Sequence, residues 1–177
     1  NLSALIWSVA DLLRGDFKQS EYGKVILPFT VLRRLDCILE PTKQAVLAEH
    51  TKRKQAKLDP DAFCKKASGH DFYNISPLDL KKLLGDQDHI GENLRAYVQG
   101  FSPAVRDIFE QFDFDTQVDR LAKAKLLYLV TEKFAGVDLH PDAVSNADMG
   151  LVFEELIRRF AELSNETAGE HFTPREV

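Results

Sequence analysis

The clearest hydrophobic pattern lies near the C-terminal end of the sequence. Apolar residues recur there at intervals of three and four positions, which is the spacing of one face of an α-helix. They are Met149, Val152, Phe153, Leu156, Ile157, Phe160 and Leu163. Ser145 or Asn146 can cap the start of this helix, and Ser164, Asn165 and Gly169 mark its exit. We therefore predict an amphipathic helix with a single buried face.

A second apolar stretch predicts the helix at the centre of the fold. Apolar side chains between Tyr22 and Leu39 surround most of a helical cylinder, which is typical of a helix in the middle of a bundle. Ser20 can cap its start. Pro28 lies inside it and removes one backbone donor, so we expect a kink there rather than a strand.

The rest of the sequence predicts further helices joined by short polar turns. Their approximate ranges are 2–13, 41–58, 76–84, 90–99, 103–112 and 116–135. Ser76 is expected to cap the third of these helices, with Pro77 at its first position, and residues 59–74 are expected to be mixed. The sequence shows no sustained strand alternation and no internal repeat. We therefore predict an all-α fold, an irregular bundle of seven to nine helices.

Composition narrows the class of protein. With 177 residues, of which 44% are apolar, the chain can bury one substantial core or two small ones. Cys37 and Cys64 form no C-x-x-C pair, and the five histidines show no metal-ligand spacing, so neither a disulfide framework nor a metal site is expected. No apolar run approaches the roughly 20 residues that span a bilayer. We expect a cytoplasmic protein without a membrane partner.

Charge is distributed unevenly along the chain. The net charge of -5 is a poor match to a stand-alone nucleic-acid binder. Residues 41–70 nevertheless hold seven basic and three acidic residues. This segment could face phosphates, or it could form a solvated helix face and loop; both interpretations stay open. Arg33 and Arg34 interrupt the central helix and must reach water, carboxylates or phosphate.

The chain closes with the segment Gly-Glu-His-Phe-Thr-Pro-Arg-Glu-Val, residues 169–177. Thr173 can cap a new helix, with Pro174 at its first position. Because the sequence stops inside this capped start, we expect it to be the front portion of a longer protein.

Both ends of the chain resemble the modification (M) subunits of type I restriction-modification systems, which are adenine-N6 DNA methyltransferases. The closing segment is similar to the family pattern Gly-x-Phe/Tyr-Tyr/Phe-Thr-Pro-Arg-x-Val at the start of the catalytic domain, with His171 replacing the first aromatic residue. The opening, Ile6-Trp7 followed by Ala10 to Gly15, resembles the family's Leu-Trp-x-x-Ala-Asp-x-Leu-Arg-Gly. The resemblance covers essentially the whole chain.

This resemblance implies a domain organisation. Residues 1–163 would form an N-terminal helical domain, and residues 164–177 would form a linker and the first residues of a truncated α/β methyltransferase domain. The family's Gly-containing cofactor loop and Asn/Asp-Pro-Pro-Phe/Tyr motif, which holds the flipped base, are missing from the sequence. The parent protein is therefore expected to be an enzyme, whereas this chain has no catalytic residues and should not methylate DNA alone.

The resemblance also implies a cofactor, partners and site residues. S-adenosylmethionine would lie beside Glu170, His171, Phe172, Thr173, Pro174 and Arg175, although these residues could equally form a simple helix cap. The expected partners are double-stranded DNA, the specificity (S) subunit, a second M subunit and the restriction (R) subunit. The domain would help to enclose DNA and to assemble the subunits. The candidate DNA contacts are Arg33, Arg34, Lys52, Arg53, Lys54, Lys65 and Lys66.

An alternative from a different class is a stand-alone helical interaction module or regulator without a role in methylation. It accounts for the acidic net charge and for the missing catalytic motifs. A self-contained enzyme is disfavoured, because no nucleophile–base pair and no phosphate-binding glycine loop can be placed in the sequence.

Overall fold

The structure, a computed structural model, describes the backbone of residues 2–171 and their side chains except those of 156, 160 and 162–171. This part contains ten α-helices, nine of them eight residues or longer, and no strand, which confirms the predicted all-α fold. In chain order the helices are α1 (Leu2–Leu13), α2 (Tyr22–Leu39), α3 (Lys43–Gln55), α4 (Asp61–Ser68), α5 (Leu80–Leu83), α6 (Ile90–Gln99), α7 (Pro103–Gln111), α8 (Phe114–Lys123), α9 (Leu127–Ala135) and α10 (Asn146–His171).

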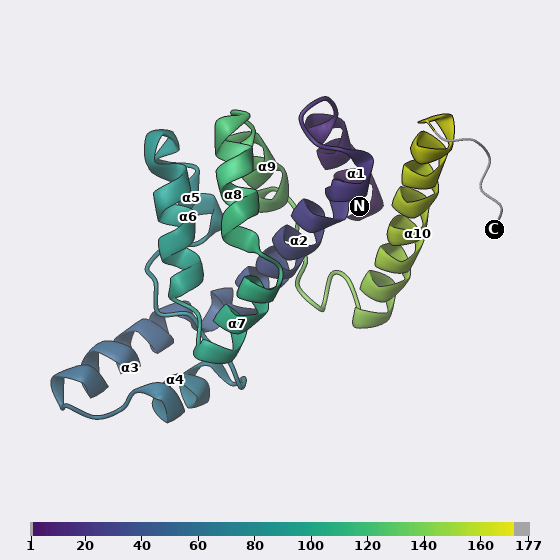
Figure 1. The fold of residues 1–177 in the computed structure, drawn as a ribbon. Coiled ribbons are helices and arrows are strands. Elements are labelled where there is room, and N and C mark those ends of the chain that lie inside the picture. Colours follow the sequence, from purple (N-terminus) through teal and green to yellow (C-terminus); the bar gives the residue numbers. More distant parts are fainter. Residues whose placement is uncertain (1, 172–177) are drawn as a thin grey trace.

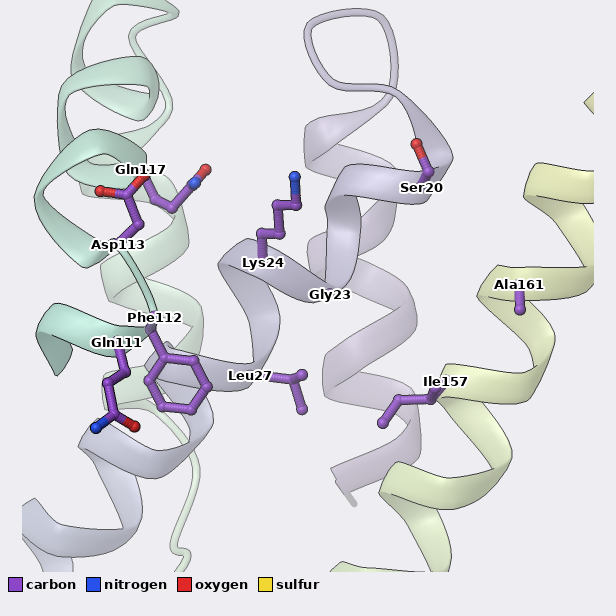
Figure 2. A pocket seen from close by; sticks show the side chains of 10 residues that line it. All are labelled: Ser20, Gly23, Lys24, Leu27, Gln111, Phe112, Asp113, Gln117, Ile157 and Ala161. Atoms are coloured by element: carbon purple, nitrogen blue, oxygen red, sulfur yellow. The ribbon is translucent and has the colours of Figure 1, made fainter. Parts of the chain in front are cut away.

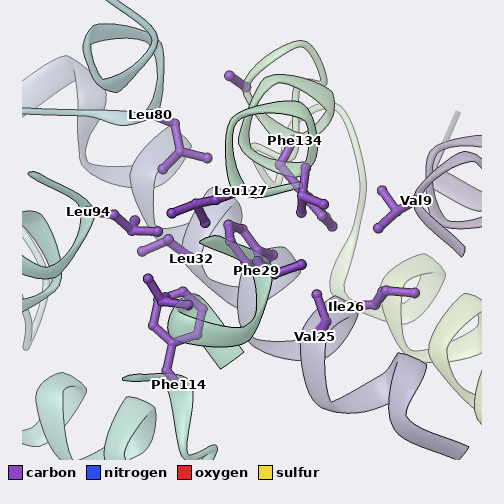
Figure 3. Close-up of a cluster of buried hydrophobic side chains, with 14 of the residues drawn as sticks. Val9, Val25, Ile26, Phe29, Leu32, Leu80, Leu94, Phe114, Leu127 and Phe134 are labelled. Atoms are coloured by element: carbon purple, nitrogen blue, oxygen red, sulfur yellow. The ribbon is translucent and has the colours of Figure 1, made fainter. Parts of the chain in front are cut away.

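Helix α2 runs through the middle of the molecule, as predicted (Figure 1). Its Phe29 is fully buried, and the ring packs edge-on against Phe114 of α8 and stacks on Phe134 of α9. Figure 3 shows these three rings at the centre of the main hydrophobic core. The helix continues through Pro28. Ser20 does not cap it, because a short 3-10 turn over 19–21 precedes the helix and no side chain caps its first residue.

Helices α3 and α4 form an antiparallel hairpin that projects from the bundle (Figure 1). It has a small core of its own, made by Val46, Cys64 and Tyr73, which is separate from the main core. Helix α3 therefore lies at the periphery of the molecule. The segment 59–74, which we expected to be mixed, contains α4, and this helix ends at a left-handed glycine, Gly69.

Two predicted helix boundaries are wrong for local reasons. The helix expected over 116–135 is broken in two, because Lys125 has a φ of 61° and the amide of Leu126 donates to the carbonyl of Leu121, which ends α8. Asp79, rather than Ser76, caps α5: its carboxylate accepts from the amide of Lys82 at 2.8 Å.

Helix α10 lies along α1 and α2 (Figure 1). The hydroxyl of Ser145 accepts from the amide of Asp148, a predicted cap. The predicted end of the helix is wrong, because the helix continues to His171. Residues such as Ser and Asn disfavour a helix by less than about 1 kcal/mol each, so they need not end it. The predicted single buried face is also only partly correct, since Met149 is buried but Ile157 is 51% exposed. Of that stripe, the side chains at 156, 160 and 163 lie outside the described residues.

Candidate nucleic-acid interface

The α3–α4 hairpin carries most of the basic residues that the sequence singled out. Helix α3 ends at Gln55, and Lys57, two residues later, is left-handed with a φ of 60°. The next amide, that of Leu58, donates to the carbonyl of Arg53 at 2.9 Å and closes the end of the helix. The carboxylate of Asp59 then accepts from the amide of Asp61 at 3.0 Å and starts α4. This tight turn holds the basic C-terminal turn of α3 beside α4.

Tyr73 anchors the hairpin to the bundle. Its hydroxyl donates to the carboxylate of Asp61 at 2.8 Å, at the start of α4. Its backbone exchanges hydrogen bonds with Ser102, which precedes α7. Burial raises the pKa of Tyr73, and the hydrogen bond to Asp61 raises it further, so the hydroxyl stays protonated and donates. Tyr73 thus ties the start of α4 to the segment that precedes α7.

The basic side chains of the hairpin fall into two groups. Arg53 lies over the ring of Phe63 and contacts Glu49 at 2.9 Å, and Lys65 contacts Asp61 at 3.1 Å. The second group is exposed and forms no ion pair within the described part of the chain. These hairpin lysines are Lys52, Lys54, Lys57 and Lys66. Their charges are free to meet phosphates.

A groove of about 580 Å³ runs between α3 and α4. Lys52 and Lys66 stand on its two sides, and Ala48 and Ala67 line it with small side chains. The carboxylate of Glu49 lies among these cations. Its pKa is lowered by the hydrogen bond to Arg53 and also by the charges of the two lysines. The groove therefore has a net positive lining.

Arg33 and Arg34, two of the candidate DNA contacts, are instead part of the core. They are only 5% and 7% exposed. Arg33 pairs with Asp36 at 2.6 Å and donates to the carbonyl of Val137. Arg34 donates to backbone carbonyls of the segment between α9 and α10, among them that of Leu139 at 2.9 Å. Because these acceptors occupy the guanidinium groups, neither arginine can face a phosphate in this structure.

A buried polar cluster lies at the base of the hairpin. The hydroxyl of Tyr97 donates to Asp36 at 2.6 Å, and the amine of Lys43 lies 5.3 Å from the centre of the Tyr97 ring and donates to the carbonyl of Leu78. Burial lowers the pKa of Lys43 to about 8 and raises that of Asp36. Each of these charged groups is satisfied within the protein, so we assign the cluster to the fold rather than to chemistry.

The remaining predicted site residues lie at the far end of α10. Glu170 and His171 are the last residues of that helix, and their side chains are not among the described ones. Phe172, Thr173, Pro174 and Arg175 lie outside the described residues altogether. Their role beside S-adenosylmethionine therefore stays a prediction.

Neither a metal-binding group nor a membrane-spanning helix is found in the described part of the chain. Its acidic residues, histidines and cysteines form no group of three that could hold a metal ion. Among the helices described, none has the length and apolar character needed to cross a membrane.

Sequence reasoning missed Lys57 as a member of the exposed group and placed Arg33 and Arg34 wrongly. The charge count over 41–70 pointed to the hairpin, but it could not tell paired from unpaired lysines. That distinction depends on α4, which brings Asp61 to Lys65 and Phe63 to Arg53.

Comparison with known proteins gives one family. A family model described as the HsdM N-terminal domain matches residues 2–134, three quarters of the chain. The matched range begins with α1 and ends inside α9, so it includes the α3–α4 hairpin and leaves α10 outside. A comparison with curated proteins finds no match.

Proposed function

Since the chain belongs to the HsdM N-terminal domain family, the domain of the type I restriction-modification M subunit, we propose that it helps the assembled methyltransferase to enclose DNA. The parent protein would transfer a methyl group from S-adenosylmethionine to the N6 atom of adenine. The family match supports the prediction made from the opening motif, and it disfavours a stand-alone regulator.

The observation that carries this proposal is the separate basic hairpin. Its four hairpin lysines are exposed, unpaired and held on a projecting element with its own core. Lysines that neutralise phosphates release counterions and so add affinity that does not depend on base sequence. In this proposal the hairpin contacts the DNA backbone, and recognition of the target sequence belongs to the specificity subunit.

The cofactor and the partners complete the proposal. Residues 170–175 would lie beside S-adenosylmethionine at the start of the catalytic domain. Double-stranded DNA, the specificity subunit, a second M subunit and the restriction subunit would be the partners, and the assembly would act in the cytoplasm.

Methyl transfer by the assembled protein tests this function. The parent protein, combined with its specificity subunit, is expected to transfer labelled methyl groups from S-adenosylmethionine to adenine in duplex DNA. Replacing Lys52, Lys54 and Lys66 by Gln should weaken DNA binding and leave cofactor binding unchanged, because the hairpin is remote from residues 170–175 in the sequence. Absence of adenine-N6 methylation by the complete assembly would refute the proposed function.

A further inference from the structure

A second groove lies away from the hairpin, between α10, α2 and the corner where α7 meets α8 (Figure 2). Its volume is about 710 Å³. Leu27 of α2, Phe112 of the corner and Ile157 of α10 give it apolar walls. Ile157 is half exposed although it belongs to the apolar face of its helix.

The walls of this groove have the shape of two helix surfaces with a gap between them. Helix α2 presents Gly23 and Leu27 one turn apart, and α10 presents Ile157 and Ala161 one turn apart. A Cβ atom added at Gly23 would meet only the side chain of Leu27, at 4.0 Å, so the space above the α2 backbone is open. Packed helices lie at interaxial distances of about 8–10 Å, depending on the side chains at the contact, and small residues such as Gly23 and Ala161 allow a close approach.

Two polar groups in the groove lack partners. Gln117 is 4% exposed, and its Oε1 atom accepts no hydrogen bond within the described part of the chain. An unpaired buried oxygen of this kind costs about 1–3 kcal/mol. Figure 2 shows the Gln117 amide extending from α8 toward α2, where the Lys24 side chain also stands. Lys24 is exposed and forms no ion pair in the described structure.

We propose that this groove seats an amphipathic α-helix of a partner subunit. The apolar face of that helix would cover Leu27, Phe112 and Ile157. An acidic side chain would pair with Lys24, and a side-chain donor would satisfy Gln117. The inference rests on the proposed function, because the partner is a subunit of the assembled enzyme, and it adds a docking surface that the DNA-facing hairpin does not provide.

Cysteine labelling tests whether the groove is covered. Cys37 and Cys64 are buried, so modification of a cysteine introduced at Ile157, identified by peptide mapping, reports on the groove. Leu129, 41% exposed on α9 and outside the groove, is the matched control position. In the assembly, maleimide should modify Ile157→Cys about ten-fold or more slowly than in the isolated protein, because labelling must await release of the helix. Leu129→Cys should react at the same rate in the assembly and in the isolated protein.

Zero-length crosslinking with a carbodiimide tests the chemistry of the occupant. Lys24 should form an amide with a glutamate or aspartate of a partner subunit, in a segment whose apolar residues recur every three to four positions. Lys24→Arg keeps the charge but removes the amine, so this crosslink should disappear. Unchanged labelling of Ile157→Cys in an active assembly, or a Lys24 crosslink to a non-helical segment, would overturn the inference while leaving the proposed function intact.

Discussion

Arg34 offers the sharpest test of the distinction between structural and DNA-facing arginines. Its guanidinium donates to the carbonyls of Leu139 and Val144 and to the side chain of Asn146. These bonds tie α2 to the segment that leads into α10. The arginine thus holds the connection between the bundle and its last helix.

The loss of stability expected for Arg34→Met follows from the burial of these acceptors. A buried polar group left without its partner costs about 1–3 kcal/mol. Leu139 is fully buried, so its carbonyl would be left without a hydrogen-bond donor. Val144 and Asn146 are less buried, so water can donate hydrogen bonds to them instead. We therefore expect the free energy of unfolding to fall by about 2–4 kcal/mol.

Urea unfolding followed by circular dichroism measures this loss. Arg14→Met is the control: this side chain is 74% exposed and pairs only with Asp11 across one turn, so the change should stay within about 0.5 kcal/mol. If Arg34→Met is no more destabilising than Arg14→Met, the assignment of Arg34 to the core is refuted and it returns to the candidate DNA contacts.

Three further predictions concern stability. The pKa of Lys43, about 8, lies below its ordinary 10.5, so the unfolded state binds more protons above pH 8. The free energy of unfolding should therefore rise by up to about 2 kcal/mol between pH 7 and 9.5. Urea titrations of Lys43→Met should lack this rise, and an equal rise in the variant would contradict the prediction. A Cβ atom at Gly100 would lie 2.6 Å from a buried asparagine oxygen, so Gly100→Ala should lower the unfolding free energy by about 1–3 kcal/mol. Gly150 lies in open space on α10, so Gly150→Ala should raise the unfolding free energy by up to about 1 kcal/mol. Equal effects of the two substitutions would refute the packing argument. Tyr73→Phe removes the bond to Asp61 and should lower the thermal midpoint, with a loss of about 1 kcal/mol; an unchanged midpoint would show that this bond does not hold the hairpin.

Most helix positions could be predicted because their apolar residues recur at helical spacing and most of these residues are buried. The break between α8 and α9 could not, because Leu121 and Val130 both reach the same core and the repeat continues across it. No glycine marks the break, and Lys125 adopts the left-handed conformation instead.

The partners of buried charges could not be predicted either. Arg33 and Arg34 visibly interrupt an apolar helix. Arg33 pairs with Asp36 three positions away, but its other acceptor, Val137, and the acceptors of Arg34 lie more than 100 positions away in the sequence. The charge of residues 41–70 pointed to the segment that folds into the α3–α4 hairpin. Only the folded hairpin separates the paired Arg53 and Lys65 from the free lysines.

The salt dependence of DNA binding by the assembled enzyme tests the central claim most directly. The test variant replaces three hairpin lysines by Gln, and the control replaces three exposed lysines of α8, α9 and the turn between them: Lys52, Lys54 and Lys66 against Lys123, Lys125 and Lys133. Each lost phosphate contact reduces the magnitude of the slope of log K against log salt by about 0.9. The magnitude of the slope should therefore fall by about 2–3 in the hairpin variant and stay unchanged in the control. Equal slopes for the two variants would contradict a DNA-facing role for the hairpin.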